Sequence, residues 1–167
     1  MAAPLDALFL RFATSKLAQL SARIVDCLGR LSDDQIWSRG SENQNAVGNL
    51  VLHLCGNLRQ WILSGARDRD AEFAASGEVS GAELASRLHT MVNAALAVIR
   101  NTTAERLGET VSIQGYEVSV LEAFGHVTEH FAQHTGQIIY ATKLLTGADL
   151  GYYRHLSKAS AHQEKTP

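Results

Sequence analysis

Proline stands at the two ends of this sequence and nowhere between them, at Pro4 and Pro167. Proline removes a backbone N–H and clashes with the preceding helical turn, so its absence leaves the whole interval open to long helices. Within the interval, apolar residues recur mostly at spacings of three and four, which is typical of one face of a helix. The sequence therefore predicts an all-α protein.

Four long helices are expected from this spacing and from the residues that begin and end helices. Asn45 is a good N-cap for the second helix, Gly65 would end it, and Gly147 would end the fourth. Four amphipathic helices of such length favour a four-helix bundle. The expected ranges are about 5–28, 45–65, 80–99 and 119–147.

Shorter elements are expected between the long helices. Residues 32–35 resemble a capping box that begins a short helical turn, and the segment Arg67 to Phe73 is predicted to be a charged connection. Two short segments, 110–113 and 116–118, flank Gln114-Gly115 and could form a small β-hairpin before the last helix. Such a ribbon is only marginally stable by itself.

The length of the chain indicates how many domains it has, and its net charge indicates which partners to expect. A chain of 167 residues is most simply one domain, here 1–150, followed by a polar tail over 151–167. Fifteen basic and seventeen acidic residues leave a net charge of -2. This balance gives no electrostatic reason to expect nucleic acid or an anionic membrane as a partner.

The cysteines and the N-terminal segment predict a location. Cys27 and Cys55 both fall in apolar helical patterns and are interpreted as buried free thiols of a cytosolic protein, with a disulfide between them as the alternative. The segment Met1 to Phe12 has no basic leader, and no apolar run reaches the ~20 residues that span a bilayer. The expected location is the cytoplasm.

Histidines carry the chemistry of this sequence. His126, His130 and His134 recur every four residues, and His53 lies in the second predicted helix. Two side chains that are four residues apart differ by only about 40° around the helix axis, so adjacent histidines can share one metal ion. Spacing alone does not decide between the pair 126/130 and the pair 130/134. With His53, three ligands and an open position would be typical of a catalytic metal site. Histidine ligands favour zinc, nickel, iron or copper.

Polar neighbours of these histidines have two interpretations. Asn49, His53 and Asn57 form a stripe beside the apolar face of the second helix, which could face a site or simply face solvent. Gln137 follows the last histidine by about one turn and could hydrogen-bond a ligand or make an ordinary contact between helices. Cys55 points away from His53 on a helix and is not expected to be a nucleophile.

The stretch from His126 to Gln137 resembles the last-helix signature of the DinB superfamily, which includes YfiT-like proteins. Asn45 to Trp61, with Gly48-Asn49-Leu50 ahead of His53, resembles the second-helix motif of one uncharacterised branch of that superfamily. The segment Arg67 to Phe73 fits the same branch. The resemblance covers nearly the whole chain.

This resemblance implies a four-helix bundle, commonly a homodimer, with one metal-binding histidine from the second helix and two from the fourth. Matched residue by residue, the ligands are His53, His130 and His134, while His126 lies near the site without being a ligand. Relatives include thiol-dependent enzymes, namely bacillithiol S-transferases and the mycothiol-dependent maleylpyruvate isomerase. No catalytic residue outside the histidines is implied for this branch.

The expected function is therefore a metal-dependent thiol S-transferase or a hydrolase with zinc, nickel or iron in a three-histidine site. Asn49, Asn57 and Gln137 are candidates for orienting the ligands or the incoming group. The partner would be a small-molecule substrate, with a low-molecular-weight thiol as the proposed co-substrate, whose carboxylates could meet Arg59, Arg67 or Arg69. For each of these arginines an ordinary surface charge is the favoured alternative. The alternative is a non-catalytic helical dimer that binds a metal or a small ligand.

Overall fold

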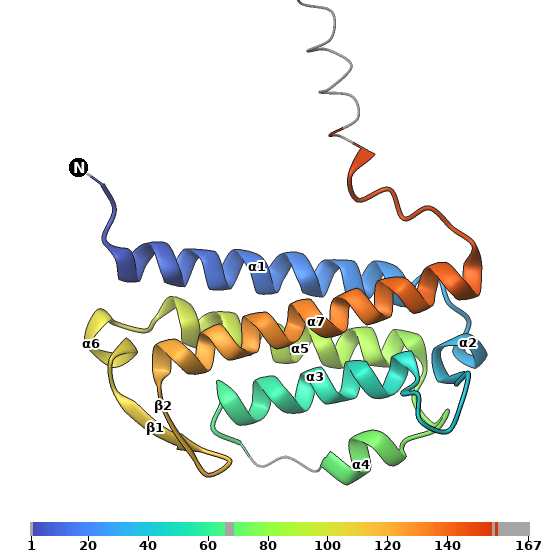
Figure 1. Cartoon of the computed structure of the whole chain (residues 1–167), viewed down its shortest axis with the longest axis horizontal. Coiled ribbons are helices and arrows are strands. Elements are labelled where there is room, and N and C mark those ends of the chain that lie inside the picture. Colours follow the sequence, from blue (N-terminus) through green and yellow to red (C-terminus); the bar gives the residue numbers. More distant parts are fainter. Residues whose placement is uncertain (1, 66–68, 155, 157–167) are drawn as a thin grey trace, which may run out of the picture.

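The computed structural model describes residues 2–65, 69–154 and 156 of the chain. Four long helices form the predicted bundle, and they run alongside one another in Figure 1. Both α1 and α3 pack against α5 and α7, so the order around the bundle is α1, α5, α3, α7. The helices are α1 Leu5–Leu28, α3 Val47–Trp61, α5 Gly81–Arg100 and α7 Val120–Thr146.

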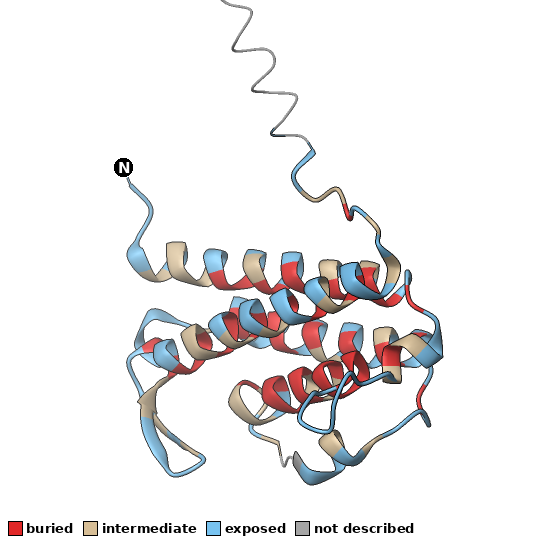
Figure 2. Ribbon diagram, turned by 45° about the vertical axis from the view of Figure 1, so that its right-hand side comes forward, coloured by how far each residue is buried: buried red, intermediate tan, exposed pale blue. Residues whose placement is uncertain are grey.

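The core lies between these helices, where each contributes one apolar stripe. Figure 2 shows buried residues along the facing sides of the helices and exposed residues on the outer sides. Complete burial of each large apolar side chain stabilises the fold by about 1.5–3 kcal/mol. The largest fully buried side chains include Phe131, Leu17, Ile24, Leu54 and Leu88.

Local signals placed the ends of the first and last helices correctly. The α1 helix covers the predicted range. The α7 helix begins after Ser119, whose hydroxyl accepts from the Glu122 backbone N–H while the Glu122 carboxylate accepts from the Ser119 backbone N–H. It ends at Gly147, which has a φ of 66°, the left-handed conformation that favours glycine. Both ends agree with the predicted range, and Gly147 is the predicted cap.

The predicted ends of the second long helix were wrong by a few residues. The N-cap of α3 is Ala46 and not Asn45, because Asn49 Oδ1 accepts from the Ala46 backbone N–H at 3.2 Å and supplies the capping acceptor from inside the helix. The helix ends at Trp61, before Gly65. Gly65 instead closes the following turn, since its N–H donates to the Arg59 carbonyl at 2.8 Å.

Two of the predicted short elements are present. The α2 helix, Asp33–Trp37, has the expected reciprocal capping box at its start. The hairpin pairs β1, Thr110–Ile113, with β2, Tyr116–Ser119, in antiparallel register. Gln114 and Gly115 both have positive φ, 55° and 81°, as a tight two-residue hairpin turn requires.

Two other short helices were not predicted. The α6 helix, Ala104–Leu107, precedes the hairpin. The α4 helix, Arg69–Ala74, lies where the sequence predicted only a charged connection from Arg67 to Phe73, whose first two residues lie outside the described part. Such a short helix has little stability by itself. Its contacts with α3 explain why sequence spacing did not reveal it.

Residues just beyond the predicted domain boundary at 150 contact α1. The Tyr152 hydroxyl donates to the Asp26 carboxylate at 2.9 Å, and the Arg23 guanidinium stacks over the Tyr152 ring at 5.0 Å. The rest of the predicted tail, apart from a few residues, lies outside the described part, so the division at residue 150 stays a prediction. Cys27 and Cys55 are free thiols, as predicted, but only Cys27 is buried, while Cys55 is half-buried. Among the helices that the structure describes, none is long and apolar enough to cross a membrane.

Candidate metal centre

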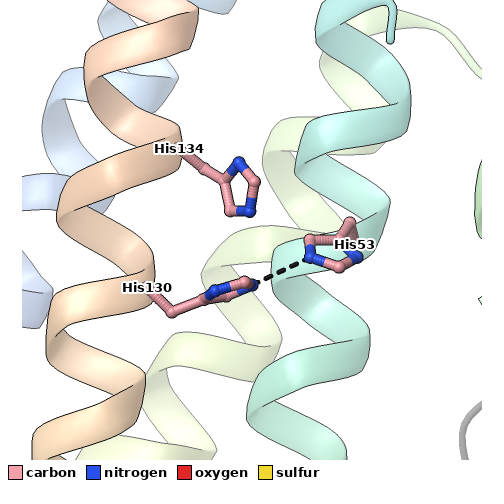
Figure 3. Close-up of side chains that lie close together, drawn as sticks. All are labelled: His53, His130 and His134. Carbon is pink, nitrogen blue, oxygen red and sulfur yellow. Dashed lines mark hydrogen bonds between the residues drawn. The ribbon is translucent and has the colours of Figure 1, made fainter.

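Three histidines from two helices meet at one edge of the bundle. His53 comes from α3, and His130 and His134 come from α7, with their rings turned toward one another (Figure 3). One ligand atom of each lies within 4.8 Å of the corresponding atoms of the other two. His53 Nε2 and His130 Nε2 are 2.8 Å apart. The structure thus brings together the histidines that the family resemblance implied.

The location of the rings follows from helix geometry and packing. His130 and His134 lie one turn apart on the face of α7 that packs against α3, and His53 lies on the face of α3 that meets them. His53 is only 6% exposed, while the other two rings are half-buried. The group is therefore closed on the side of α3 and reached from the side of α7.

The donor set fits a divalent transition metal. Imidazole nitrogens bind zinc at about 2.0–2.1 Å, and a tetrahedral arrangement at that distance separates two nitrogens by about 3.3 Å. The Nε2 atoms of His53 and His130, at 2.8 Å, have to separate only slightly. Within the described residues, no carboxylate or thiol joins the group. Three ligands leave a coordination position for water or substrate.

In the described part of the chain, two of the rings have an oxygen acceptor beside their other nitrogen, at hydrogen-bond distance for His134 and at ion-pair distance for His53. His134 Nδ1 lies 2.6 Å from Gln137 Oε1, and His53 Nδ1 lies 3.7 Å from Glu72 Oε2. An acceptor at Nδ1 places the proton there and leaves Nε2 free as a ligand atom, an arrangement common around protein metals. The sequence suggested that Gln137 hydrogen-bonds either a ligand or a neighbouring helix, and the contact with His134 is the first of these. Glu72 was missed because it lies in the segment from Arg67 to Phe73, which was predicted to be only a charged connection.

Asn49 joins α3 to the segment that carries Glu72. Its side chain is fully buried, and its amide nitrogen lies 3.0 Å from the Glu72 carbonyl, 2.9 Å from the Ala75 carbonyl and 3.4 Å from the Phe73 carbonyl. Its oxygen accepts from Arg39 Nη2 at 2.9 Å as well as from its own helix start. Asn49 therefore contacts α4 and not the rings, and any influence on them passes through α4.

Asn57, the third candidate beside the histidines, is 2% exposed. Its Oδ1 atom is buried and has no hydrogen-bond partner among the described residues. An unpaired buried polar atom costs about 1–3 kcal/mol. The orienting roles of Asn49, Asn57 and Gln137 toward a metal or an incoming group stay predictions.

His126 lies beside the group and does not join it. Its ring packs against Trp61 with centroids 4.1 Å apart and the planes tilted by 35°, and it stacks on His130 at 5.5 Å with 22° between planes. Burial lowers the pKa of His126 by disfavouring the imidazolium form. Of the two histidine pairs that spacing left open, 130/134 is the one that meets His53.

The other side chains considered for the chemistry are Cys55 and three arginines. Burial raises the pKa of the Cys55 thiol to about 12, so it stays protonated at neutral pH, in keeping with the expectation that it is no nucleophile. Among the arginines considered for an acidic co-substrate, Arg59 borders a hollow of about 590 Å³ between α3, α4 and α5. Arg67 and the side chain of Arg69 lie outside the described part.

Fold and site together define a helical-bundle protein with a three-histidine group that could hold a metal ion. The chain belongs to the family described as Protein of unknown function (DUF1572), whose family model matches residues 5–160. It is similar in fold to a solved structure described as the conserved protein of locus from Enterococcus faecalis, with a TM-score of 0.72 and 14% sequence identity. That similarity covers 88% of this chain and 100% of the other. No curated protein matches the chain.

Proposed function

We propose that this chain is a metal-dependent enzyme of the DinB/YfiT-like type, in which His53, His130 and His134 bind zinc, nickel or iron. The convergence of three imidazoles from two helices carries the proposal. A three-histidine set with an open position is typical of catalytic rather than closed structural zinc sites. The resemblance of both histidine-bearing helices to that superfamily supports the same reading.

The proposed reaction is thiol S-transfer or hydrolysis. A bound metal would favour the deprotonated form of a thiol or water near neutral pH and so provide a nucleophile. The protein's own contribution is to hold the three rings in place, with Gln137 behind His134 and Glu72 beside His53. The neighbouring rings of His126 and Trp61 form an aromatic wall next to His130. A substrate at the site would meet this wall.

The position of the site argues against a metal that only stabilises the fold. The bundle core is built from apolar side chains, and two of the three histidine rings are half-buried at its edge. Small zinc domains, by contrast, depend on their metal to fold. We therefore expect the metal-free protein to remain folded, with unchanged far-UV circular dichroism after dialysis against a chelator.

One observation favours the alternative of a non-catalytic binding module. His53 and His130 contact each other directly at 2.8 Å, so the two rings can satisfy each other without an ion. A site of that kind could be occupied only when a metal or small ligand is abundant. The two functions differ in metal content and in the effect of chelation on turnover.

The deciding measurement is the metal content of protein purified without a histidine tag, determined by plasma mass spectrometry. Near-stoichiometric zinc, nickel or iron in the wild type and none in His130→Ala would support the proposal. His89→Ala is a matched control, because His89 is exposed on α5, where its ring is hydrogen-bonded to Asn93 of the same helix. Metal-free wild-type protein that also fails to take up zinc, nickel or iron on titration would overturn it.

Catalysis itself needs a second test. Thiol-transfer and hydrolysis reactions would be screened with loaded protein, followed by chelation and restoration of the metal. Turnover that is lost on chelation and regained with the metal supports the enzyme. Stoichiometric metal without any turnover would favour the binding module.

Three further expectations remain predictions: a low-molecular-weight thiol as co-substrate, a cytoplasmic location and a homodimer. The last is the simplest to check. Size-exclusion chromatography with light scattering should give about twice the 18.1 kDa chain mass for a homodimer.

A further inference from the structure

Among the described residues, Glu72 of α4 is an ionisable side chain that reaches the histidine group from outside α3 and α7. Its Oε2 atom lies 3.7 Å from His53 Nδ1, and the Glu72 side chain is only 12% exposed. The neighbouring ring of Phe73 lies 5.0 Å from the His53 ring. Two consecutive residues of α4 therefore contact the same imidazole, one at its nitrogen and one across its ring.

We propose that Glu72 is a positioning residue for the metal site: its carboxylate holds the His53 Nδ1–H and thereby directs Nε2 toward the ion. This inference rests on the proposed metal binding by the three histidines. In metal sites the ligating histidine commonly donates its second N–H to a carboxylate or carbonyl, which sets the tautomer and increases the basicity of the ligand nitrogen.

The geometry assigns Glu72 to the outer side of the ring and not to the ion. His53 Nε2 faces His130 Nε2, so Nδ1 lies on the other edge of the imidazole. Glu72 does not belong to the group whose ligand atoms lie within 4.8 Å of one another. Its carboxylate therefore acts through His53.

The fold places Glu72 by means of Asn49. Asn49 and His53 are four residues apart and lie one turn apart on the same face of α3. The Asn49 amide nitrogen donates to backbone carbonyls of α4, including that of Glu72 itself, while Arg39 donates to both Asn49 Oδ1 and the Phe73 carbonyl. The segment 72–75 is thus fixed over the turn of α3 that carries the ligand.

A distance of 3.7 Å is within ion-pair range and longer than a hydrogen bond. A positive ion at Nε2 makes the Nδ1–H a stronger donor and increases its attraction to a carboxylate. Because Glu72 is shielded from water, that attraction is screened less than at an open surface. Metal binding should therefore depend on this carboxylate.

The test compares zinc affinity among wild type, Glu72→Ala, Glu72→Gln and the control Asp70→Asn, by competition with a chromophoric chelator. Loss of a carboxylate that supports a ligand histidine typically costs 10–100-fold in metal affinity. We expect a loss of about that size for Glu72→Ala and a smaller one for Glu72→Gln, whose amide oxygen still accepts. Asp70→Asn, an exposed position on the same helix, should stay within about twofold of wild type.

Two further readouts separate positioning from a merely structural role. The visible spectrum of bound Co²⁺ should change in Glu72→Ala, because the orientation of a ligand ring changes, while the melting temperature of the metal-free protein should stay near that of wild type. Equal zinc affinity for wild type and Glu72→Ala would overturn the inference and leave the metal site standing. So would weaker binding with an unchanged Co²⁺ spectrum and a large loss of metal-free stability. Wild-type protein that binds neither metal would overturn the proposed function as well.

Discussion

The two outer sides of the histidine site are supported in different ways. On the α7 side, His134 is held by Gln137, which lies one turn further along the same helix and is exposed. On the α3 side, His53 faces Glu72, which belongs to a separate short helix and is shielded from solvent. The first support needs only helix geometry. The second needs α4 to be anchored by Asn49, so it depends on tertiary structure.

From this difference we expect the support of His53 by α4 to determine how precisely the three ligand nitrogens are positioned. A shielded carboxylate interacts more strongly with a ring N–H than an exposed amide oxygen does. The support on the α3 side can also be lost as a unit, because a displacement of α4 would take both Glu72 and Phe73 away from the His53 ring. The variants below test that asymmetry.

The largest expected effect is on metal content when a ligand ring itself is removed. His53→Ala should abolish stoichiometric metal binding, and His134→Ala should do the same, since two nitrogens would remain. His126→Ala should keep its metal, because His126 stacks on His130 without joining the group. Plasma mass spectrometry on the three proteins checks this. An equal metal content in all three variants would mean that these histidines are not the ligands, and the comparison between the α3 and α7 sides would then have no basis.

The next largest effect is expected from Asn49→Ala. This change leaves the α4 carbonyls without their buried donor, and it should lower the free energy of unfolding by roughly 2–3 kcal/mol. Zinc affinity should fall at least as far as in Glu72→Ala, because the whole α4 support is loosened. Urea denaturation and chelator competition measure the two effects.

The control for that variant is Asn93→Ala, a change at an exposed asparagine of α5. It should alter the free energy of unfolding by no more than about 0.5 kcal/mol. If Asn49→Ala were equally mild and bound zinc normally, α4 would not be the support of the α3 side.

A smaller effect is expected from Gln137→Ala. The Gln137 contact is short, but its side chain is exposed, so water can replace its oxygen at His134 Nδ1. We expect zinc affinity to fall by about tenfold or less, at the low end of the range for such partners. The same chelator competition checks it. A loss greater than that of Glu72→Ala would reverse the comparison between the two sides.

The smallest effect is expected from a contact that does not involve the histidines, the hydrogen bond from the Tyr152 hydroxyl to the Asp26 carboxylate, here called the Tyr152 tether. The pKa of Asp26 is lowered chiefly by its hydrogen bond from Arg30, with the Tyr152 hydroxyl adding to the shift. A lowered folded-state pKa stabilises the protein above the unfolded value near 3.8, and the stability is lost as pH falls through the folded pKa.

Tyr152→Phe should therefore be slightly less stable than wild type at pH 7, and the difference should narrow below about pH 3.8. Urea denaturation across that pH range measures it. Zinc affinity should not change, since this tether joins the segment after α7 to α1 and not to the site. A change in zinc affinity would mean that contacts elsewhere in the bundle also position the histidine rings, and that α4 has no special role.

Much of the bundle could be predicted from local signals. The capping residues around α7 and the hairpin turn at Gln114-Gly115 each act within a few neighbouring residues, so their effects can be recognised in the sequence. The α3 start was displaced because Asn49, inside the helix, replaced the expected N-cap. Gln137 could be noted as a neighbour of His134 for the same local reason.

The sequence by itself determined the four long helices, and hence that His130 and His134 share a face, because helix periodicity is a local property. Spacing could not choose between that pair and His126/His130, since the choice depends on how α7 is rotated against α3. Glu72 was hidden for a related reason: α4 is short, and contacts with α3 hold it in place. Only tertiary packing brought residues far apart in the chain to opposite edges of the same imidazole.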